Sequence, residues 1–404
     1  MEIDSDIIIV GGGLNGSLLA IAAAKIGFST IVLDSKGNHR DELNSFDGRS
    51  YALAASSVRL LKNLDIFEDI RGCSQPILDI EILDGKLVQG PSQFSLHFDN
   101  NEIHNGPMGY MVEDRFIQKT LFAQILATNQ IDYKFDSKVT EHYQQGSYIS
   151  VQLDDGQKLR TRLVVGADGR NSNIAKRAKI KKSGWRYKQN ALVCAIEHEI
   201  DHKGLAWQYF LPNGPLAILP MTGNRSSIVW TEQTKNADAI NALDDNQYIK
   251  ILNSRLGSFL GKSKLIGSRH SFPLELRIAD RFIDDRLALI GDAAHSVHPI
   301  AGQGLNAGFK DIAVLAHVIQ DSYCRGEDFG SLGVLKRYEE WRRFDSVQLA
   351  YSTDLFNRLF SNENEALQIV RNIGIKILDS IPAAKRNIIK EAAGITGELP
   401  RLMR

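Results

Sequence analysis

The chain has 404 residues, 43% of them hydrophobic and 24% charged, a composition typical of a globular protein with two or three domains. Its 48 Lys and Arg residues balance 48 Asp and Glu residues, so the chain as a whole has no net charge to attract nucleic acid or anionic lipid. Three widely separated cysteines, Cys73, Cys194 and Cys324, exclude a disulfide framework and a structural zinc site. The acidic first residues and the lack of an apolar run of roughly 18 residues predict a cytoplasmic protein with no signal peptide and no membrane span.

The first 34 residues predict a nucleotide-binding βαβ unit. Residues 7–10 are a β-branched run typical of a strand buried in a parallel sheet, residues 17–24 favour a helix, and residues 30–33 predict a second strand. A GxGxxG motif lies between the first strand and the helix, and an acid follows the second strand. Its glycines allow a tight turn and let backbone amides approach a pyrophosphate, while the acid accepts hydrogen bonds from ribose hydroxyls. The motif predicts a dinucleotide site, without deciding between FAD and NAD, made by Gly11, Gly13, Leu14, Asn15, Gly16 and Asp34.

Two later segments again join an apolar strand to a glycine and an aspartate. Residues 163–165 and 287–290 are the strands, and the motif residues that follow are Asp168 with Gly169 and Gly291 with Asp292. Gly291 and Asp292 are suited to place a carboxylate on a polyol chain. Further on, Gly302 and Gly304 leave backbone amides free at the start of a helix, where they would stabilise negative charge on a bound ring.

The segments between the motifs predict a second, smaller domain, because residues 76–98 and 185–272 alternate polar and apolar side chains. Trp207, Tyr209 and Trp230 alternate on these strands and are interpreted as core, with a substrate cavity as the alternative. The prediction is an α/β fold in which a Rossmann-like domain with a parallel sheet is interrupted by a smaller antiparallel-sheet substrate domain and followed by helices. The expected boundaries are 1–75, 99–184 and 273–345 for the first domain, 76–98 and 185–272 for the second, and 346–404 for the C-terminal helical region.

The C-terminal region combines basic and apolar residues. Apolar residues recur at helical spacing in 332–343 and 365–378, and residues 366–404 hold seven basic residues against three acids. The apolar stripe of the second segment consists of Ile369, Val370, Ile373 and Ile377. Such a helix suits contact with an anionic membrane or a partner, and docking on its own domain is an equal alternative.

The three motifs, in this order, resemble those of the FAD-dependent aromatic hydroxylases of the single-component class A type. The run from Gly291 to His295, the run from His298 to Asn306 and the end of the chain from Gly397 to Leu402 are similar to the ubiquinone-biosynthesis branch of that family. The resemblance covers essentially the whole chain and is weakest in the substrate domain. It implies a Rossmann-like FAD-binding domain and FAD as the resident cofactor, with NADPH or NADH as a transient reductant.

The resemblance also implies roles for individual residues. Gly11, Gly13, Gly16 and Asp34 would hold the ADP half of FAD, and Asp292 would meet its ribityl and pyrophosphate region. The flavin ring would be lined by Pro299, Gly302, Gln303, Gly304, Leu305 and Asn306, and the first four of these are the expected catalytic positions. Arg49 and Arg115 are expected near the cofactor, and Asp168 would serve both FAD and NAD(P)H.

Two positions depart from the family pattern. Asp34 stands where glutamate is usual, which supplies a shorter but chemically equivalent acceptor. Ala175 stands where arginine is common, so Lys176 or Arg177 would have to take over its contacts with the nicotinamide nucleotide.

The implied activity is hydroxylation of the aromatic ring of a polyprenylated phenol with NAD(P)H and O2. The ring position that is hydroxylated, the choice between NADH and NADPH, and the oligomeric state stay open. Contact with a membrane or a biosynthetic complex also stays open. A prenyl reductase, a halogenase and a non-enzymatic FAD-bound accessory subunit are the alternatives, although the Trp-x-Trp-x-Ile-Pro element of halogenases is absent. No metal is expected, because His295 and His298 lack a third ligand and suit a structural role.

Overall fold

The computed structural model describes residues 3–38, 43–86, 90–100, 106–296, 303–360 and 381–404. Its central sheet has the strand order β17-β18-β11-β1-β2-β8, and the neighbours from β18 to β8 pair in parallel. These strands are β1 (Ser5–Val10), β2 (Thr30–Leu33), β8 (Ile131–Lys134), β11 (Lys158–Gly166), β17 (Ile283–Asp284) and β18 (Leu287–Leu289). The three isoleucines of β1 are fully buried, as expected for a strand with helices or loops on both faces.

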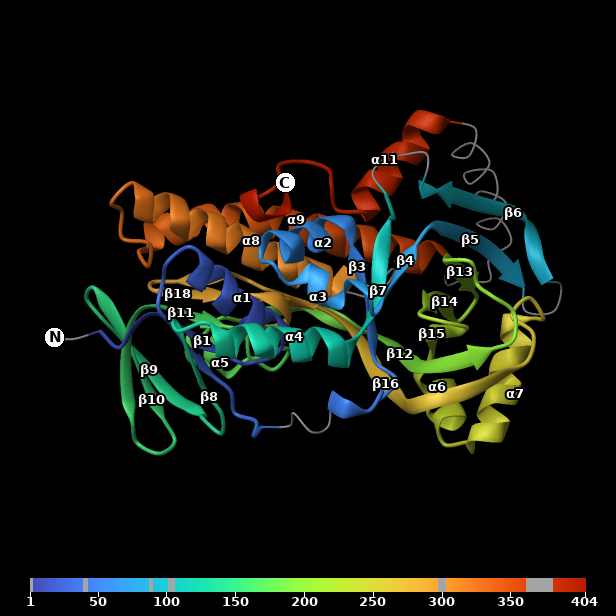
Figure 1. The fold of residues 1–404 in the computed structure, drawn as a ribbon, viewed down its shortest axis with the longest axis horizontal. Helices are drawn as coiled ribbons and strands as arrows, with labels where there is room; N and C mark the ends of the chain where they lie inside the picture. Colours follow the sequence, from blue (N-terminus) through green and yellow to red (C-terminus); the bar gives the residue numbers. More distant parts are fainter. Residues whose placement is uncertain (1–2, 39–42, 87–89, 101–105, 297–302, 361–380) are drawn as a thin grey trace.

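Helices pack on this sheet and together with it form the larger domain (Figure 1). Helix α1 packs on β2, on α4 and on α8, and α8 packs in turn on α9. The helices are α1 (Leu14–Lys25), α2 (Ala55–Asn63), α3 (Phe67–Arg71), α4 (Asp114–Ala127), α5 (Asn173–Arg177), α8 (Gln303–Cys324) and α9 (Leu332–Phe360). A hairpin of β9 (Val139–Gln145) and β10 (Tyr148–Leu153) continues antiparallel from β11, and β3 (Ser50–Ala54), β7 (Gly109–Glu113) and β4 (Ser74–Ile77) form a small separate sheet.

The second large sheet lies at the other end of the molecule (Figure 1) and has the order β19-β16-β12-β15-β14-β13-β5-β6. Its pairs are antiparallel except for β5 with β13, a parallel pair that joins the two separated segments of the predicted domain. The strands are β5 (Asp79–Lys86), β6 (Gly90–Asp99), β12 (Lys182–His198), β13 (Leu205–Leu211), β14 (Gly214–Met221), β15 (Arg225–Gln233), β16 (Ser263–Ala279) and β19 (His295–Ser296). Trp207 and Trp230 are buried in its core beside α7 (Asp245–Leu256), which confirms their interpretation, and α6 (Thr234–Asn241) packs on β12.

The expected domain boundaries meet continuous elements. Strands β12 and β16 run through the predicted limits at residues 185 and 272, and α9 runs through the limit at 345. Helix α11 (Pro382–Ala392) docks on the smaller domain through Ile389, which is buried with Phe98 and Phe210. The apolar stripe predicted from Ile369 to Ile377 lies outside the described residues. Among the helices that the structure describes, none has the length and hydropathy needed to cross a bilayer.

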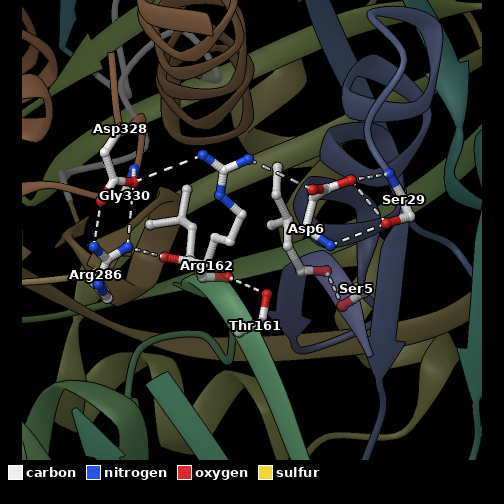
Figure 2. A network of polar contacts seen from close by, with 10 residues as sticks. Ser5, Asp6, Ser29, Thr161, Arg162, Arg286, Asp328 and Gly330 are labelled. Carbon is white, nitrogen blue, oxygen red and sulfur yellow. Dashed lines mark hydrogen bonds and ion pairs between the residues drawn. The ribbon is translucent and has the colours of Figure 1, made fainter. Parts of the chain in front are cut away.

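A polar network, shown in Figure 2, joins the central strands. Its residues Asp6, Ser29 and Arg286 lie at or just before the starts of β1, β2 and β18, whereas the motifs follow the strand ends. Arg286, just before β18, donates to the carbonyl oxygen of Arg162 at 3.1 Å and forms an ion pair with Asp328. The Arg162 guanidinium lies 3.9 Å from Asp328 and 4.0 Å from Asp6. Asp6, in β1, accepts hydrogen bonds from the amide and hydroxyl of Ser29, which precedes β2. One network therefore fixes the positions of β2, β1, β11 and β18 relative to one another along the strand direction.

We predict that Arg286→Gln lowers the free energy of unfolding by about 3 kcal/mol, because the buried guanidinium donates to the carbonyl oxygens of Gly146 and Arg162 and to the partly exposed carboxylate of Asp328, and the variant removes its charge and most of these hydrogen bonds. Urea unfolding followed by circular dichroism measures the change. The matched control is Arg71→Gln, which removes an exposed ion pair with Glu68 and is expected to cost less than about 1 kcal/mol. Equal losses in the two variants would contradict the role given to the network.

Candidate functional site

The loops after the carboxyl ends of β1, β2 and β11 line a cleft of about 760 Å³. This volume is in the range of small-molecule and cofactor sites. Of the residues predicted for the cofactor, seven line the cleft: Gly11, Gly13, Leu14, Asp34, Arg49, Arg115 and Asp168. Its other wall includes Asp47, Tyr51, Asp114 and Gln118. The cleft is thus built where parallel strands end, which is the usual ligand position in an open α/β sheet.

Three glycines of the GxGxxG motif have different surroundings. Gly11 has a φ of +109°, and a Cβ there would lie 2.5 Å from the carbonyl oxygen of Ala167. A Cβ on Gly16 would lie 1.9 Å from the carbonyl oxygen of Gly11, so α1 packs closely on the strand before it. A Cβ on Gly13 would meet no atom of the described residues within 4 Å. Gly11 and Gly16 are therefore required by the fold, whereas Gly13 leaves the start of α1 open to the cleft.

Asp34 has a partner that the sequence analysis missed. The hydroxyl of Tyr133 lies 3.0 Å from Asp34 Oδ2 and 3.1 Å from the carbonyl oxygen of Gly12. Asp34 Oδ1 accepts the amide of Lys36, so both oxygens of the carboxylate are oriented. A Cβ on Gly12 would lie 1.8 Å from the Tyr133 hydroxyl, which explains why glycine also stands at this position, where the GxGxxG motif allows any residue. Tyr133 belongs to β8, and no local signal shows that β8 lies beside β2.

Asp168 combines a structural contact with an unused oxygen. Its Oδ2 accepts the amides of Asn173 and Ile174 at 2.6 and 3.1 Å, which caps α5. Its Oδ1 is buried and has no hydrogen-bond partner among the described residues. Of the two residues expected to replace an arginine at Ala175, Arg177 lines the cleft, whereas Lys176 is exposed and is not part of its lining.

Two consecutive buried carboxylates orient the two predicted arginines. Asp114 Oδ2 lies 2.9 Å from Arg49 Nη2, and Glu113 Oε2 lies 2.7 Å from Arg115 Nε. Glu113 also holds Arg225, at 2.9 Å, and thereby connects the cleft with β15 of the smaller domain. Burial acts to lower the pKa of Arg49, but Asp114 and Asp47 outweigh it and hold that pKa above its ordinary value. Both guanidiniums are therefore held in fixed positions at the cleft, which suits recognition of an anionic ligand.

The loop of Gly291 and Asp292 is fixed from behind by a buried carboxylate on α8. Asp311 Oδ2 accepts the Gly291 amide at 2.8 Å and contacts His295 Nε2 at 2.8 Å, and Oδ1 accepts Arg342 Nε at 2.7 Å. Burial acts to raise the pKa of Asp311, but His295 and Arg342 hold that pKa below its ordinary value. The expected structural role of His295 agrees with this contact. No group of three metal-binding side chains occurs in the described parts of the chain, and His298 lies outside them.

Asn15 and Asn306 connect the motifs to one another. The Asn15 side chain lies against Gly291 and Gly308, where an added Cβ would come within 2.2 and 2.6 Å of its amide nitrogen. The Asn306 side chain accepts from the Ala54 amide at 2.9 Å and donates to the Ala52 carbonyl at 2.8 Å. These two amides hold α1, α8 and β3 together behind the cleft.

None of the other residues predicted for the site, where the structure describes them, is in the cleft lining. Gln303, Gly304 and Leu305 begin α8, and Pro299 and Gly302 lie outside the described residues. Within the described ranges, the cleft lining does not include Asn15, Gly16, Gly291, Asp292, Gln303, Gly304, Leu305 or Asn306.

Residues 4–349 match the protein family described as FAD binding domain. This chain belongs to that family, and its cofactor is FAD. The ubiquinone hydroxylase UbiL of Rhodospirillum rubrum is 40% identical over 99% of this chain and 92% of its own length. The 3-demethoxyubiquinol 3-hydroxylase of Escherichia coli is 31% identical over 97% of this chain and 99% of its own length.

A solved structure has the same fold. The p-nitrophenol 4-monooxygenase PnpA of Pseudomonas putida DLL-E4 superposes with a TM-score of 0.80, at 18% identity, over 98% of this chain and 100% of its own. The residues of the cleft fit FAD chemically. The open amides at Gly13 suit a diphosphate, Asp34 suits ribose hydroxyls, and the unused Oδ1 of Asp168 suits a hydroxyl or amide donor.

We predict that Gly13→Ala weakens FAD binding about 10-fold or more and leaves the melting temperature of the apoprotein unchanged. Gly13 has a φ of −68°, which alanine adopts without strain, so its methyl group would obstruct only the ligand. Titration of apoprotein with FAD, followed by flavin fluorescence, measures the affinity.

The control is Gly72→Ala, since Gly72 has a φ of −66° and equally open surroundings but is not part of the cleft. Wild-type FAD affinity in Gly13→Ala would refute the assignment of this loop to the diphosphate.

Proposed function

We propose that this protein is an FAD-dependent monooxygenase that uses NAD(P)H and O2 to hydroxylate the aromatic ring of a polyprenylated phenol or quinol in ubiquinone biosynthesis. The observation that carries the proposal is the match of nearly the whole chain to two hydroxylases named for ubiquinone or demethoxyubiquinol. Membership of the FAD binding domain family and the cleft at the carboxyl ends of the strands support it. Nothing in these comparisons favours a prenyl reductase, a halogenase or a non-enzymatic subunit.

The residues of the site divide the work of binding. Asp34, oriented by Tyr133, would bind ribose, the amides that begin α1 would bind the diphosphate, and Asp292 would bind the polyol chain. The amides of Gln303 and Gly304 at the start of α8, where the helix dipole is positive, would stabilise negative charge on the flavin ring. Bound FAD supplies the redox chemistry with O2, while the protein positions the aromatic ring and excludes water.

The nicotinamide nucleotide would be bound transiently beside Asp168. Arg177 lines the same cleft and is the better placed of the two cations that the sequence offered in place of an arginine at residue 175. No side-chain nucleophile is needed for this reaction, because electron transfer and oxygen activation belong to the cofactor.

The decisive experiment uses the visible spectrum of the purified holoprotein. We expect a flavin spectrum that bleaches when NADPH or NADH is added without oxygen. Admission of O2 in the presence of a short-chain prenyl phenol should then restore the spectrum and yield a product with one added oxygen atom, detected by mass spectrometry. Reduction without hydroxylation of any prenyl phenol or quinol would move the assignment to a reductase, and a protein that cannot bind FAD would overturn it.

We predict that Asp292→Ala loses most of its bound FAD, because the variant lacks the carboxylate proposed for the polyol chain. The ratio of flavin to protein absorbance after purification measures the loss. The control is Asp280→Ala. Asp280 is an exposed acid immediately after β16, and its carboxylate accepts a hydrogen bond from the Ser183 hydroxyl. An Asp292→Ala protein with full flavin content and full turnover would refute the role of this residue.

A peripheral contact with anionic membrane is also part of the proposal, because the substrate is a lipid. Helix α11 exposes Ile388, at 38%, and the cations Arg386 and Lys390, and Ile381, exposed at 46%, immediately precedes the helix. Ile389 is buried and anchors the helix on the smaller domain. At about 3.6 residues per turn, Arg386 and Lys390 lie on one side of Ile389 and Ile388 lies on the other, so the exposed surface of the helix carries basic and apolar side chains of the kinds found in helices that lie on a lipid surface.

We predict that Arg386→Glu with Lys390→Glu reduces cosedimentation with vesicles that contain anionic lipid at least about three-fold, since each cation near such a surface is worth about 1 kcal/mol. FAD content serves as the control for folding. Unchanged cosedimentation would show that α11 is not a membrane contact.

A further inference from the structure

One lysine connects two of the three motif loops. Lys182 is the first residue of β12, and its Nζ donates to the carbonyl oxygen of Arg170 at 2.9 Å and to that of Asp292 at 3.0 Å. The first carbonyl belongs to the loop of Asp168, after β11, and the second to the loop after β18. A single ammonium group therefore sets the separation of these loops at the edge of the sheet.

The charges around this ammonium group are mainly negative. Burial lowers the pKa of Lys182 below its ordinary value, although the nearby carboxylates of Asp168 and Asp292 act to raise it. Arg277 and Glu275, both on β16, also face it and act in opposite directions. Asp168 lines the cleft, and its carboxylate would repel an anionic ligand bound there, so Lys182 is positioned to offset that repulsion.

The same lysine lies where the smaller domain begins. Lys182 pairs with Ala279 of β16, and both strands continue into the second large sheet. The loop of Asp168 has a second tie to these strands, because Arg170 Nε lies 3.6 Å from the buried Glu275 Oε1. The position of the two loops is therefore coupled to the strands that carry the smaller domain.

We propose that Lys182 is a positioning residue for FAD, which fixes the spacing of the Asp168 and Asp292 loops and offsets their negative charge. It touches backbone oxygens of the loops, and its effect on the cofactor is transmitted through them. The inference rests on the proposed contact of these loops with FAD.

The test compares FAD affinity with apoprotein stability in Lys182→Met, which keeps the length of the side chain and removes its charge and its donors. We expect the dissociation constant of FAD to rise about 10-fold or more while the melting temperature of the apoprotein stays within about 2 °C of wild type. Lys182→Arg, which restores the charge and donors, should recover at least part of the affinity. The control is Lys181→Met, which alters the exposed residue immediately before β12 and should change neither quantity.

An unchanged FAD dissociation constant in Lys182→Met would overturn the inference, as would a loss of apoprotein stability with normal FAD affinity, because the lysine would then be a structural brace alone. Should that variant not fold, Lys182→Gln, which keeps an amide donor without the charge, is measured by the same criteria. Failure of the inference is distinguishable from failure of the proposed function. In the first case wild type binds FAD and hydroxylates while Lys182→Met binds it equally well, and in the second wild type itself does not.

Discussion

Parallel pairing of β2, β1, β11 and β18 is the constraint on which the site depends. Because the strands run in the same direction, the loops that follow them meet at one edge of the sheet, although Gly11 and Gly291 are far apart in the chain. The Arg286 network holds the opposite ends of these strands in register (Figure 2). A slip of any one strand would move its motif away from the cleft.

Alignment of the strands does not by itself fix the loops, and two kinds of contact complete the task. Where backbone segments approach most closely, glycine is required, as at Gly11 and Gly16. Where loops must be held apart or turned, charged groups bind their backbone, as the buried Asp311 binds the Gly291 amide and the half-buried Lys182 binds two carbonyl oxygens. These charges are partnered, so their burial orients the loops without leaving an uncompensated ion.

The two domains share strands as well as an interface. Strands β12 and β16 begin or end beside the motif loops and continue into the sheet that is expected to cover the substrate. Glu113 adds a second connection, since it holds Arg115 of the cleft and Arg225 of β15 at once. Movement of the smaller sheet would therefore shift Arg115 and the Asp168 loop. This coupling suits a reaction in which the reductant and the aromatic substrate must each reach the same cofactor.

The sequence by itself determined the fold class, the three motifs and the buried core positions Trp207 and Trp230. Each of these depends on residues close in the chain: a strand, a glycine turn and a helix follow one another in the GxGxxG region, and alternation along single strands marks the core. Only the tertiary structure decided which side chains complete the cleft. Tyr133 meets Asp34 because β8 lies beside β2, and Arg177 rather than Lys176 lines the cleft. Asn306 lies outside the lining and binds the backbone of β3. Lys182 binds the loop of Asp292, 110 residues further along the chain, and Asp311 binds Gly291, 20 residues before it. Such contacts depend on strand order and helix packing, which no local periodicity in the sequence encodes.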